Sequence, residues 1–406
     1  MSLFTQKEID NLVRPILAHA QVDPRQAALH AAVSHLIEPG DQSMGLLLHT
    51  LGAERTIEAL VERLSADQLV QKNGQQIGDQ LETSFQDGFA NVWNNAKERW
   101  LPRLSKSAVL ESFEISRQLG FSLLPFTDSK YPQQFDGLDY ARPPLLWLVG
   151  NLGLLSASYS VAIVGSRNSS PYGARVASEL AAVASENQIV TISGGAYGID
   201  SIVHKSTLNL QGQTVAILAG GLEHLYPKGN AELLRTIGKV GLLVAEQPPP
   251  ITPARWRFLQ RNRLIAALSS ATVIVEAGKT SGALNTARHA ITLGRGIAVV
   301  PGPIESPFSV GCHDLLNELP SEVRLLARTR ELLDLVGMQV DLSTSNEGMG
   351  ALEKRALDAI GRKTVEAWEV QRLAGLTLKE TQIALGSLEL LGLIQRFGAA
   401  YAQNAI

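Results

Sequence analysis

The residues of this chain that are best placed to bind a ligand are Gly165-Ser166-Arg167. They directly follow an apolar run at residues 161–164, and a helical pattern comes next at residues 174–185. A strand that ends in a Gly-Ser turn before a helix presents unpaired backbone N–H groups, and the helix dipole favours an anion there. Arg167 adds a fixed positive charge with a planar set of donors. The sequence therefore predicts a phosphate site at this turn.

A second candidate is the segment 255–263, which lies in a stretch without Asp or Glu between Glu246 and Glu276. It contains Arg255, Trp256, Arg257, Phe258, Arg261, Asn262 and Arg263. One interpretation is an ordinary helix start with solvated arginines, and this must hold for part of the segment. The other is a groove for single-stranded nucleic acid, in which the arginines contact the phosphate backbone and an aromatic ring stacks on a base. Each such stack contributes roughly 1–3 kcal/mol to the binding free energy.

Glycine-rich segments follow several of the apolar runs. Gly194, Gly195 and Tyr197 come after the run at residues 189–192, and Ser281 and Gly282 come after the run at residues 272–275. Glycine allows a ligand to approach the backbone closely. A single such glycine-rich segment is equally well explained as an ordinary turn that connects a helix and a strand. Because several lie at the same edge of the expected sheet, we predict a binding crevice.

Established enzyme motifs fail when their spacing is checked. Arg167 stands where the dinucleotide motif G-x-G-x-x-G requires glycine, and Val273 stands where a Walker A motif ending at Gly278-Lys279-Thr280 requires it. We find no nucleophile elbow and no spacing typical of zinc ligands. The scattered histidines are expected to be surface or capping residues: His204, His224, His289 and His313. The sequence therefore predicts no catalytic residue, no metal and no cofactor.

The elements that position these residues are short apolar strands alternating with helical patterns. The expected strands are residues 161–164, 189–192, 215–218, 242–244, 272–275 and 297–300. Nearly continuous apolar strands are typical of a parallel sheet covered on both faces. The fold class expected is α/β, with a Rossmann-like, doubly wound, mostly parallel sheet that binds ligands beyond the carboxyl ends of its strands.

Length and composition predict more than one domain. The chain has 406 residues, a net charge of −3 and a single cysteine, so nucleic-acid binding would require a local basic patch, and a cytoplasmic location is expected. No signal peptide or membrane-spanning run is recognised. We expect an all-helical domain at 1–120, the α/β domain at 121–335, a linker at 336–349 and a winged-helix-like domain at 350–406.

Taken together in their order and spacing, these motifs resemble the DprA/Smf family of bacterial DNA-processing proteins. The resemblance rests on Gly165-Ser166-Arg167, Tyr172-Gly173, Ser193-Gly194, Gly198-Ile199-Asp200, His204, Tyr226-Pro227, Arg261-Asn262-Arg263, Glu276, Ser281-Gly282, Pro301-Gly302 and Gly311. It implies a homodimer that binds single-stranded DNA non-specifically and loads RecA recombinase on it during natural transformation. It also implies an N-terminal domain like a sterile alpha motif or helix-hairpin-helix and a C-terminal winged helix.

The resemblance also implies roles for individual residues. Ser166 and Arg167 would hold a DNA phosphate, Phe258 would stack on a base, and Arg255, Arg261 and Arg263 would line the groove. Two positions depart from the family pattern: Tyr197 replaces a frequent basic residue, and Leu259 replaces the proline that usually follows the phenylalanine.

Two other classes of function stay open at this point. One is a nucleotide-processing enzyme of the phosphoribohydrolase-like type, whose motif Gly194-Gly195 and Glu276 match loosely, with Glu276 as the carboxylate. The other is a protein-interaction scaffold that docks partners through the C-terminal unit.

Overall fold

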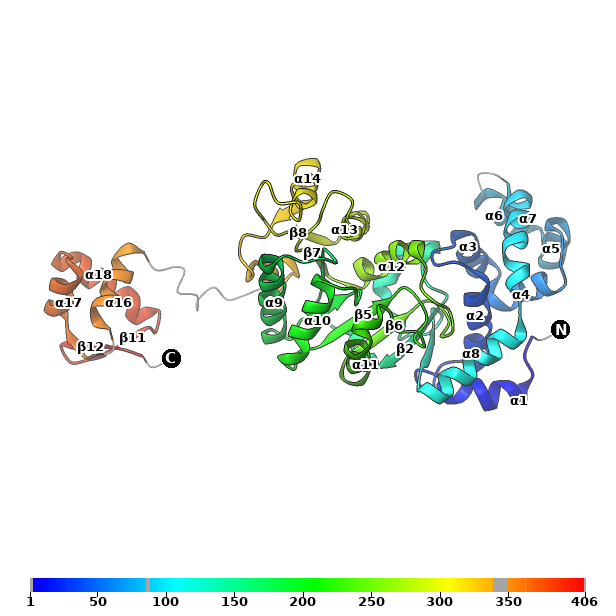
Figure 1. Cartoon of the computed structure of the whole chain (residues 1–406), viewed down its shortest axis with the longest axis horizontal. Coiled ribbons are helices and arrows are strands. Elements are labelled where there is room, and N and C mark those ends of the chain that lie inside the picture. The colour runs from blue at the N-terminus through cyan, green and yellow to red at the C-terminus, as the bar shows by residue number, and fades with distance from the viewer. Residues whose placement is uncertain (1–2, 85–87, 339–349, 362, 405–406) are drawn as a thin grey trace. The chain divides into compact units, whose positions relative to one another are not determined.

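The computed structural model describes residues 3–84, 88–338, 350–361 and 363–404 (Figure 1). It divides into two compact units, Met1–Met338 and Gln339–Ile406. From residue 339 onward, the linker expected at 336–349 lies outside the described residues. Among the described residues, no helix is both long enough and apolar enough to cross a membrane.

The first part of the larger unit is helical up to the sheet. Its helices are α1 (Gln6–Glu8), α2 (Pro24–Leu36), α3 (Gln42–Thr50), α4 (Gly52–Val61), α5 (Ala66–Asn73), α6 (Gln75–Ser84), α7 (Phe89–Trp100) and α8 (Lys106–Leu119), with short turns at Ile9–Val13, Arg14–Ile16 and Leu101–Arg103. Helix α2 packs on the first two strands of the sheet, and its apolar side chains belong to the same core as the sheet. The boundary expected after residue 120 is therefore not a division between compact units.

The described residues of the larger unit form a nine-stranded sheet in the order β1-β2-β6-β5-β4-β3-β7-β8-β9. The strands are β1 (Ser122–Pro125), β2 (Leu145–Gly150), β3 (Ser160–Val164), β4 (Val190–Ser193), β5 (Thr214–Leu218), β6 (Leu242–Ala245), β7 (Ala271–Ile274), β8 (Gly296–Val299) and β9 (Val323–Leu325). Strand β2 is antiparallel to both β1 and β6, and all other pairs are parallel. The expected mostly parallel α/β sheet is confirmed, and the six strands predicted are β3 to β8.

Helices cover both faces of this sheet (Figure 1). They are α9 (Pro171–Glu186), α10 (Ile199–Asn209), α11 (Ala231–Val240), α12 (Arg255–Leu268), α13 (Gly282–Thr292), α14 (Val310–Glu318) and α15 (Glu331–Leu335), with short helices η4 (Gln133–Ala141), η5 (Leu152–Ser156) and η6 (Lys228–Asn230). The chain moves one way along the sheet from β3 to β6 and the other way from β7 to β9. Because such crossovers are right-handed, helices α9 to α11 lie on one face, and α12 and α13 lie together on the other.

The smaller unit has its own apolar core. It consists of α16 (Ala351–Ile360), α17 (Ala367–Ala374), α18 (Leu378–Leu390), β10 (Val365–Glu366), β11 (Ile394–Phe397) and β12 (Ala400–Gln403). The three strands form an antiparallel sheet in the order β10-β12-β11.

Candidate functional site

A crevice opens where the order of the parallel strands reverses. Strands β3 and β7 are neighbours, yet the chain leaves them toward opposite edges of the sheet. Ligands of doubly wound sheets bind at such a point, beyond the carboxyl ends of the strands. The structure has a cavity of about 690 Å³ there. It is lined by Val164, Gly165, Ser166, Arg167, Asn168, Ala196, Asp200, Arg255, Trp256, Phe258, Leu259, Arg261, Asn262, Ile265, Gly278, Thr280, Ser281, Gly282, Ala283 and Thr286.

The turn after β3 is held in one conformation by its neighbours. The Ser166 hydroxyl donates to the Asn168 carbonyl at 2.9 Å, and the Ser166 carbonyl accepts from the Ile199 backbone N–H at 3.1 Å. Gly198 has φ +72°, and a Cβ there would lie 2.2 Å from the Ser166 carbonyl oxygen. Glycine is therefore needed for this close approach. The result is a fixed turn that leaves the Arg167 side chain exposed.

The start of helix α9 is not available to a phosphate, contrary to the prediction. The Glu276 carboxylate is buried there and accepts hydrogen bonds from the Ser170 backbone N–H at 3.0 Å and from the Ser170 hydroxyl. A Cβ at Gly173 would lie 2.2 Å from the Glu276 carboxyl carbon. The negative charge that favours a helix N-terminus is thus supplied by the protein itself. A phosphate in the crevice would therefore have to bind at Arg167, beyond this helix end.

This arrangement also bears on the enzyme alternative, which requires Glu276 as a reacting carboxylate. Both of its oxygens accept hydrogen bonds from Ser170, and its exposed fraction is 2%. Its geometry is that of a residue that caps a helix.

The glycines after β4 accommodate the protein's own side chains. Gly194 and Gly195 are both buried and do not line the cavity. A Cβ at Gly194 would lie 2.3 Å from the Arg261 guanidinium, and one at Gly195 would lie 2.8 Å from a Leu234 methyl group. The predicted DNA contacts at these two glycines are therefore not supported, because the space beside them is already filled.

Arg261 is buried and bonds to the ends of two strands. Its Nη1 donates to the Gly194 carbonyl at 2.8 Å and to the Ile217 carbonyl. Burial lowers the pKa of Arg261 to about 10, against the opposing effect of the Asp200 carboxylate. Burial likewise raises the pKa of Asp200, whereas the charge of Arg261 lowers it. Arg261 lines the cavity, but its donors hold the β4 and β5 ends in place.

Two further arginines predicted to contact DNA are committed to carboxylates elsewhere. Arg263 is 3% exposed and pairs with the buried Glu246, with Nη2 and Oε1 2.7 Å apart. Arg257 pairs with Glu38, with Nε and Oε2 2.8 Å apart. Neither lines the cavity. The DNA contacts predicted for Arg257 and Arg263 are therefore not supported, because each guanidinium is paired with a carboxylate.

The cations that remain open to the crevice are Arg167 and Arg255. Both are exposed, and neither has an ion pair among the described residues. The Arg167 guanidinium carbon lies 5.0 Å from the centre of the Phe258 ring. Tyr226 also lies beside this ring, at 5.6 Å between ring centroids. A half-buried ring beside a free guanidinium suits a nucleotide, with the base on the ring and the phosphate on the cation.

Helix α13 contributes its N-terminus to the lining of the cavity. The Ser281 hydroxyl accepts from the Ala283 backbone N–H at 3.3 Å, and Ser281 and Gly282 both line the cavity. Asn262 Nδ2 donates to the Gly282 carbonyl at 3.1 Å, which ties α12 to α13. The predicted residues Ser281, Gly282 and Asn262 are thus brought together with Arg167 and Phe258.

Two other aromatic residues near the crevice, Trp256 and Tyr226, had no DNA-binding role assigned from the sequence. Trp256 is 57% exposed and lines the cavity, and Tyr226 is 49% exposed beside Phe258. Their position in sequence was a usable signal, since one adjoins Arg255 and the other follows β5. Tyr197 is exposed and its hydroxyl accepts from the Gly229 backbone N–H at 3.2 Å, so it lies against the loop after β5.

His204 is not the surface or capping residue that was expected. It is fully buried, and its Nδ1 lies 2.7 Å from the Thr214 hydroxyl. Burial lowers the pKa of His204 to about 3. This histidine is therefore neutral at physiological pH and belongs to the packing of α10 on the sheet.

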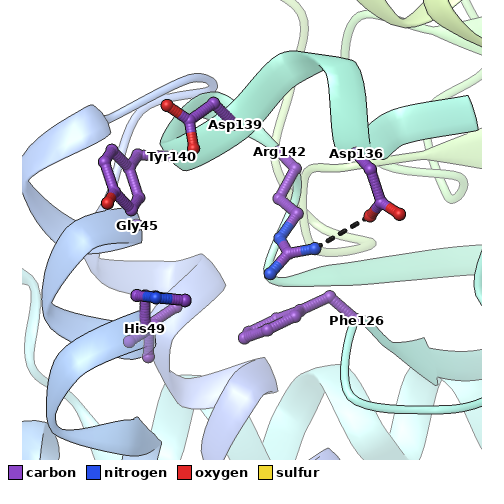
Figure 2. Close-up of a pocket in the computed structure, with 8 residues that line it drawn as sticks. Gly45, His49, Phe126, Asp136, Asp139, Tyr140 and Arg142 are labelled. Atoms are coloured by element: carbon purple, nitrogen blue, oxygen red, sulfur yellow. Dashed lines mark hydrogen bonds and ion pairs between the residues drawn. The ribbon is translucent and has the colours of Figure 1, made fainter. Parts of the chain in front are cut away.

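A second cavity, of about 350 Å³, lies between α3 and η4 (Figure 2). Figure 2 shows the Arg142 guanidinium above Phe126, 4.5 Å from the ring centre, and directed at Asp136, to which it donates at 3.0 Å. The adjacent Ala141 carbonyl accepts from Arg263 Nη2 at 2.8 Å, so this wall also supports α12. None of the predicted site residues lines this cavity.

Comparison with known proteins places this fold and site in one family. The family model described as DNA recombination-mediator protein A matches residues 122–334. A putative DNA processing protein DprA of Mycobacterium tuberculosis is 42% identical over 246 residues, covering 60% of this chain and 61% of that protein. The DNA processing protein DprA of Bacillus subtilis is 33% identical over 239 residues, covering 59% of this chain and 78% of that protein.

A solved structure agrees with these sequence matches. DNA processing protein A from Streptococcus pneumoniae superposes with a TM-score of 0.59 at 27% identity, covering 76% of this chain and 97% of that chain. The matched region includes every predicted site residue and both loops that form the crevice. This chain belongs to the DNA recombination-mediator protein A family, also called DprA/Smf.

Proposed function

We propose that the crevice between the β3 and β7 loops binds single-stranded DNA without sequence preference. The observation that carries this proposal is the pairing of Arg167 with the half-buried Phe258 ring, 5.0 Å away, at the point where the strand order reverses. The two groups offer what one nucleotide needs: a cation for the phosphate and an aromatic face for the base. Arg255 and the N-terminus of α13 extend the positive lining.

Single-stranded DNA suits this site better than a duplex. Stacking on Phe258 requires a base whose face is free, and a paired base in a duplex has both faces covered by its neighbours. Sequence-tolerant stacking together with phosphate contacts therefore predicts binding that is strong, non-specific and sensitive to salt.

We further propose that the chain acts as a recombination mediator that loads RecA on this DNA and works as a homodimer. The family description and the resemblance of the crevice motifs support this role. Stimulation of RecA ATP hydrolysis on DNA coated with a single-strand-binding protein tests the loading, and light scattering tests the dimer. A cytoplasmic location, the linker bounds 336–349 and the names Rossmann-like and winged-helix stay predictions.

The decisive experiment compares fluorescence anisotropy of labelled single-stranded and duplex oligonucleotides titrated with the full chain. We expect tighter binding to the single strand and an affinity that falls as salt rises. Equal affinity for both DNAs, or no dependence on salt, would contradict the proposal. Release of a free base from a nucleotide, lost in Glu276→Gln, would instead support the enzyme alternative.

A further inference from the structure

Trp256 is an exposed ring at the edge of the crevice whose orientation is fixed by the protein. It is the second residue of α12, it lines the cavity, and 57% of it is exposed. Its indole Nε1 donates to Glu38 Oε2 at 3.1 Å. The two residues are 218 positions apart in the sequence, and the acceptor Glu38 lies in the segment just after α2. An exposed tryptophan whose only polar atom is tied down keeps its aromatic surface available.

Glu38 holds more than the indole. Its two oxygens accept from Arg257 Nε and Nη2, each at 2.8 Å, and Oε1 also accepts from Arg103 at 3.0 Å. The fork of two parallel hydrogen bonds gives the Arg257 guanidinium a defined orientation. Although burial alone would raise the pKa of Glu38, the hydrogen bonds from Arg257 and Trp256 and the nearby arginine charges lower it to about 2. Glu38 is therefore ionised at physiological pH.

Arg257 in turn lies against the tryptophan, with its guanidinium carbon 5.7 Å from the ring centre. Glu38, Arg257 and Trp256 are thus mutually linked, and we call them the Glu38 clamp. Trp256 and Phe258 are two positions apart on a helix, so their side chains leave the helix axis about 200° apart. Both nevertheless line the same cavity. They would therefore meet different bases of one strand.

We propose that Trp256 is a second base-stacking residue of the crevice and that Glu38 is the positioning residue that holds it ready. The proposal rests on the proposed binding of single-stranded DNA, and it gives the N-terminal helical region a task in that binding. A ring already fixed by Glu38 and Arg257 loses little conformational freedom when a base stacks on it, so more of the stacking energy appears as affinity. The chemical group recognised is an unpaired nucleobase.

The affinity test uses a fluorescein-labelled oligothymidylate and anisotropy on the full chain. Trp256→Ala is expected to weaken binding roughly 5- to 150-fold, the equivalent of one lost stack. The slope of affinity against salt should not change, because no charge is removed. The matched control is Trp368→Ala, which removes another exposed indole bonded to a carboxylate, that of Glu366 at 2.8 Å, in the smaller unit. It should leave affinity within twofold of wild type.

A fluorescence test reports on the ring itself. Three of the five tryptophans, Trp93, Trp100 and Trp147, are fully buried. In a Trp368→Phe background the exposed indole is that of Trp256, so DNA that stacks on it should quench the emission. Trp256→Phe in the same background should abolish this quenching. Glu38→Gln should weaken both the quenching and the affinity, and its effect should largely disappear when Trp256 is already alanine.

Each outcome is decisive. Suppose that wild type binds the oligonucleotide and that Phe258→Ala weakens this binding. If Trp256→Ala then binds with wild-type affinity and the DNA still quenches the tryptophan emission, the proposal for Trp256 is wrong and the proposed function stands. If Glu38→Gln lowers only the thermal unfolding temperature and leaves the quenching unchanged, Glu38 is structural and does not position the ring. If wild type does not bind single-stranded DNA, the proposed function itself fails.

Discussion

Replacing Arg167 by alanine should weaken DNA binding without unfolding the protein. The Arg167 backbone is held by the contacts of Ser166 and Gly198, whereas its side chain is exposed and has no ion pair among the described residues. Removing the side chain therefore leaves no buried charge without a partner. We expect the free energy of unfolding to change by less than about 0.5 kcal/mol, as is usual for exposed positions.

The expected loss of affinity follows from the contact that Arg167 would make. A hydrogen bond to a charged group contributes about 1.5–3 kcal/mol, which corresponds to roughly 10- to 150-fold in the dissociation constant. Each phosphate contact on a single strand also contributes about 0.7 to the slope of log affinity against log salt. Arg167→Ala should therefore lower both the affinity and, by about 0.7, the steepness of the salt dependence.

Anisotropy titrations of a labelled single strand over a series of salt concentrations measure both quantities. The matched control is Arg235→Ala, which removes another exposed arginine from α11, where it pairs with Glu232 at 2.9 Å. It changes the net charge by the same amount at a surface outside the crevice. The reasoning is refuted if the two variants behave alike, or if Arg167→Ala keeps the wild-type affinity and slope.

Three further predictions test the surrounding structure. Arg263→Ala leaves the buried Glu246 carboxylate without its ion-pair partner and should lower the free energy of unfolding by about 3–5 kcal/mol. Urea unfolding measures this, and an unchanged midpoint would contradict the pairing. Burial lowers the pKa of His30 to about 4 and of His204 to about 3. Below pH 6.5 these two histidines therefore become protonated in the unfolded chain but stay neutral in the folded protein. The free energy of unfolding should therefore fall by about 2 kcal/mol for the two together between pH 6.5 and 5.5, and a flat profile would show that they are not buried neutral. A chain truncated after residue 338 retains the whole crevice and should keep the wild-type affinity for single-stranded DNA, whereas a large loss would place the main binding surface in the smaller unit.

The sheet was predictable because its central strands are buried on both faces. Their apolar runs stand out from the polar loops around them, as in β3 and β5. Strands β1 and β2 were missed, because they join the sheet antiparallel at one edge and lie on either side of a segment with several prolines. Strand β9 was missed because it has three residues.

The site was predictable only in part, and charge pairing explains the difference. The sequence shows that arginines cluster at residues 255–263, but it does not show which of them have acidic partners. Arg257 forms an ion pair with Glu38, and Arg263 forms one with Glu246, whereas Arg255 is exposed. Pairing over such distances is set by tertiary packing, which no local pattern encodes.

The central claim is that single-stranded DNA lies in the crevice between the β3 and β7 loops, and photochemical crosslinking tests it most directly. An oligonucleotide that carries a photoreactive halogenated uracil is crosslinked to the full chain, and the modified peptides are identified by mass spectrometry. The account predicts crosslinks at Trp256, Phe258 or Tyr226, which are lost when unlabelled single strand competes and persist when duplex competes. Crosslinks confined to other surfaces, such as that of the smaller unit, would contradict it.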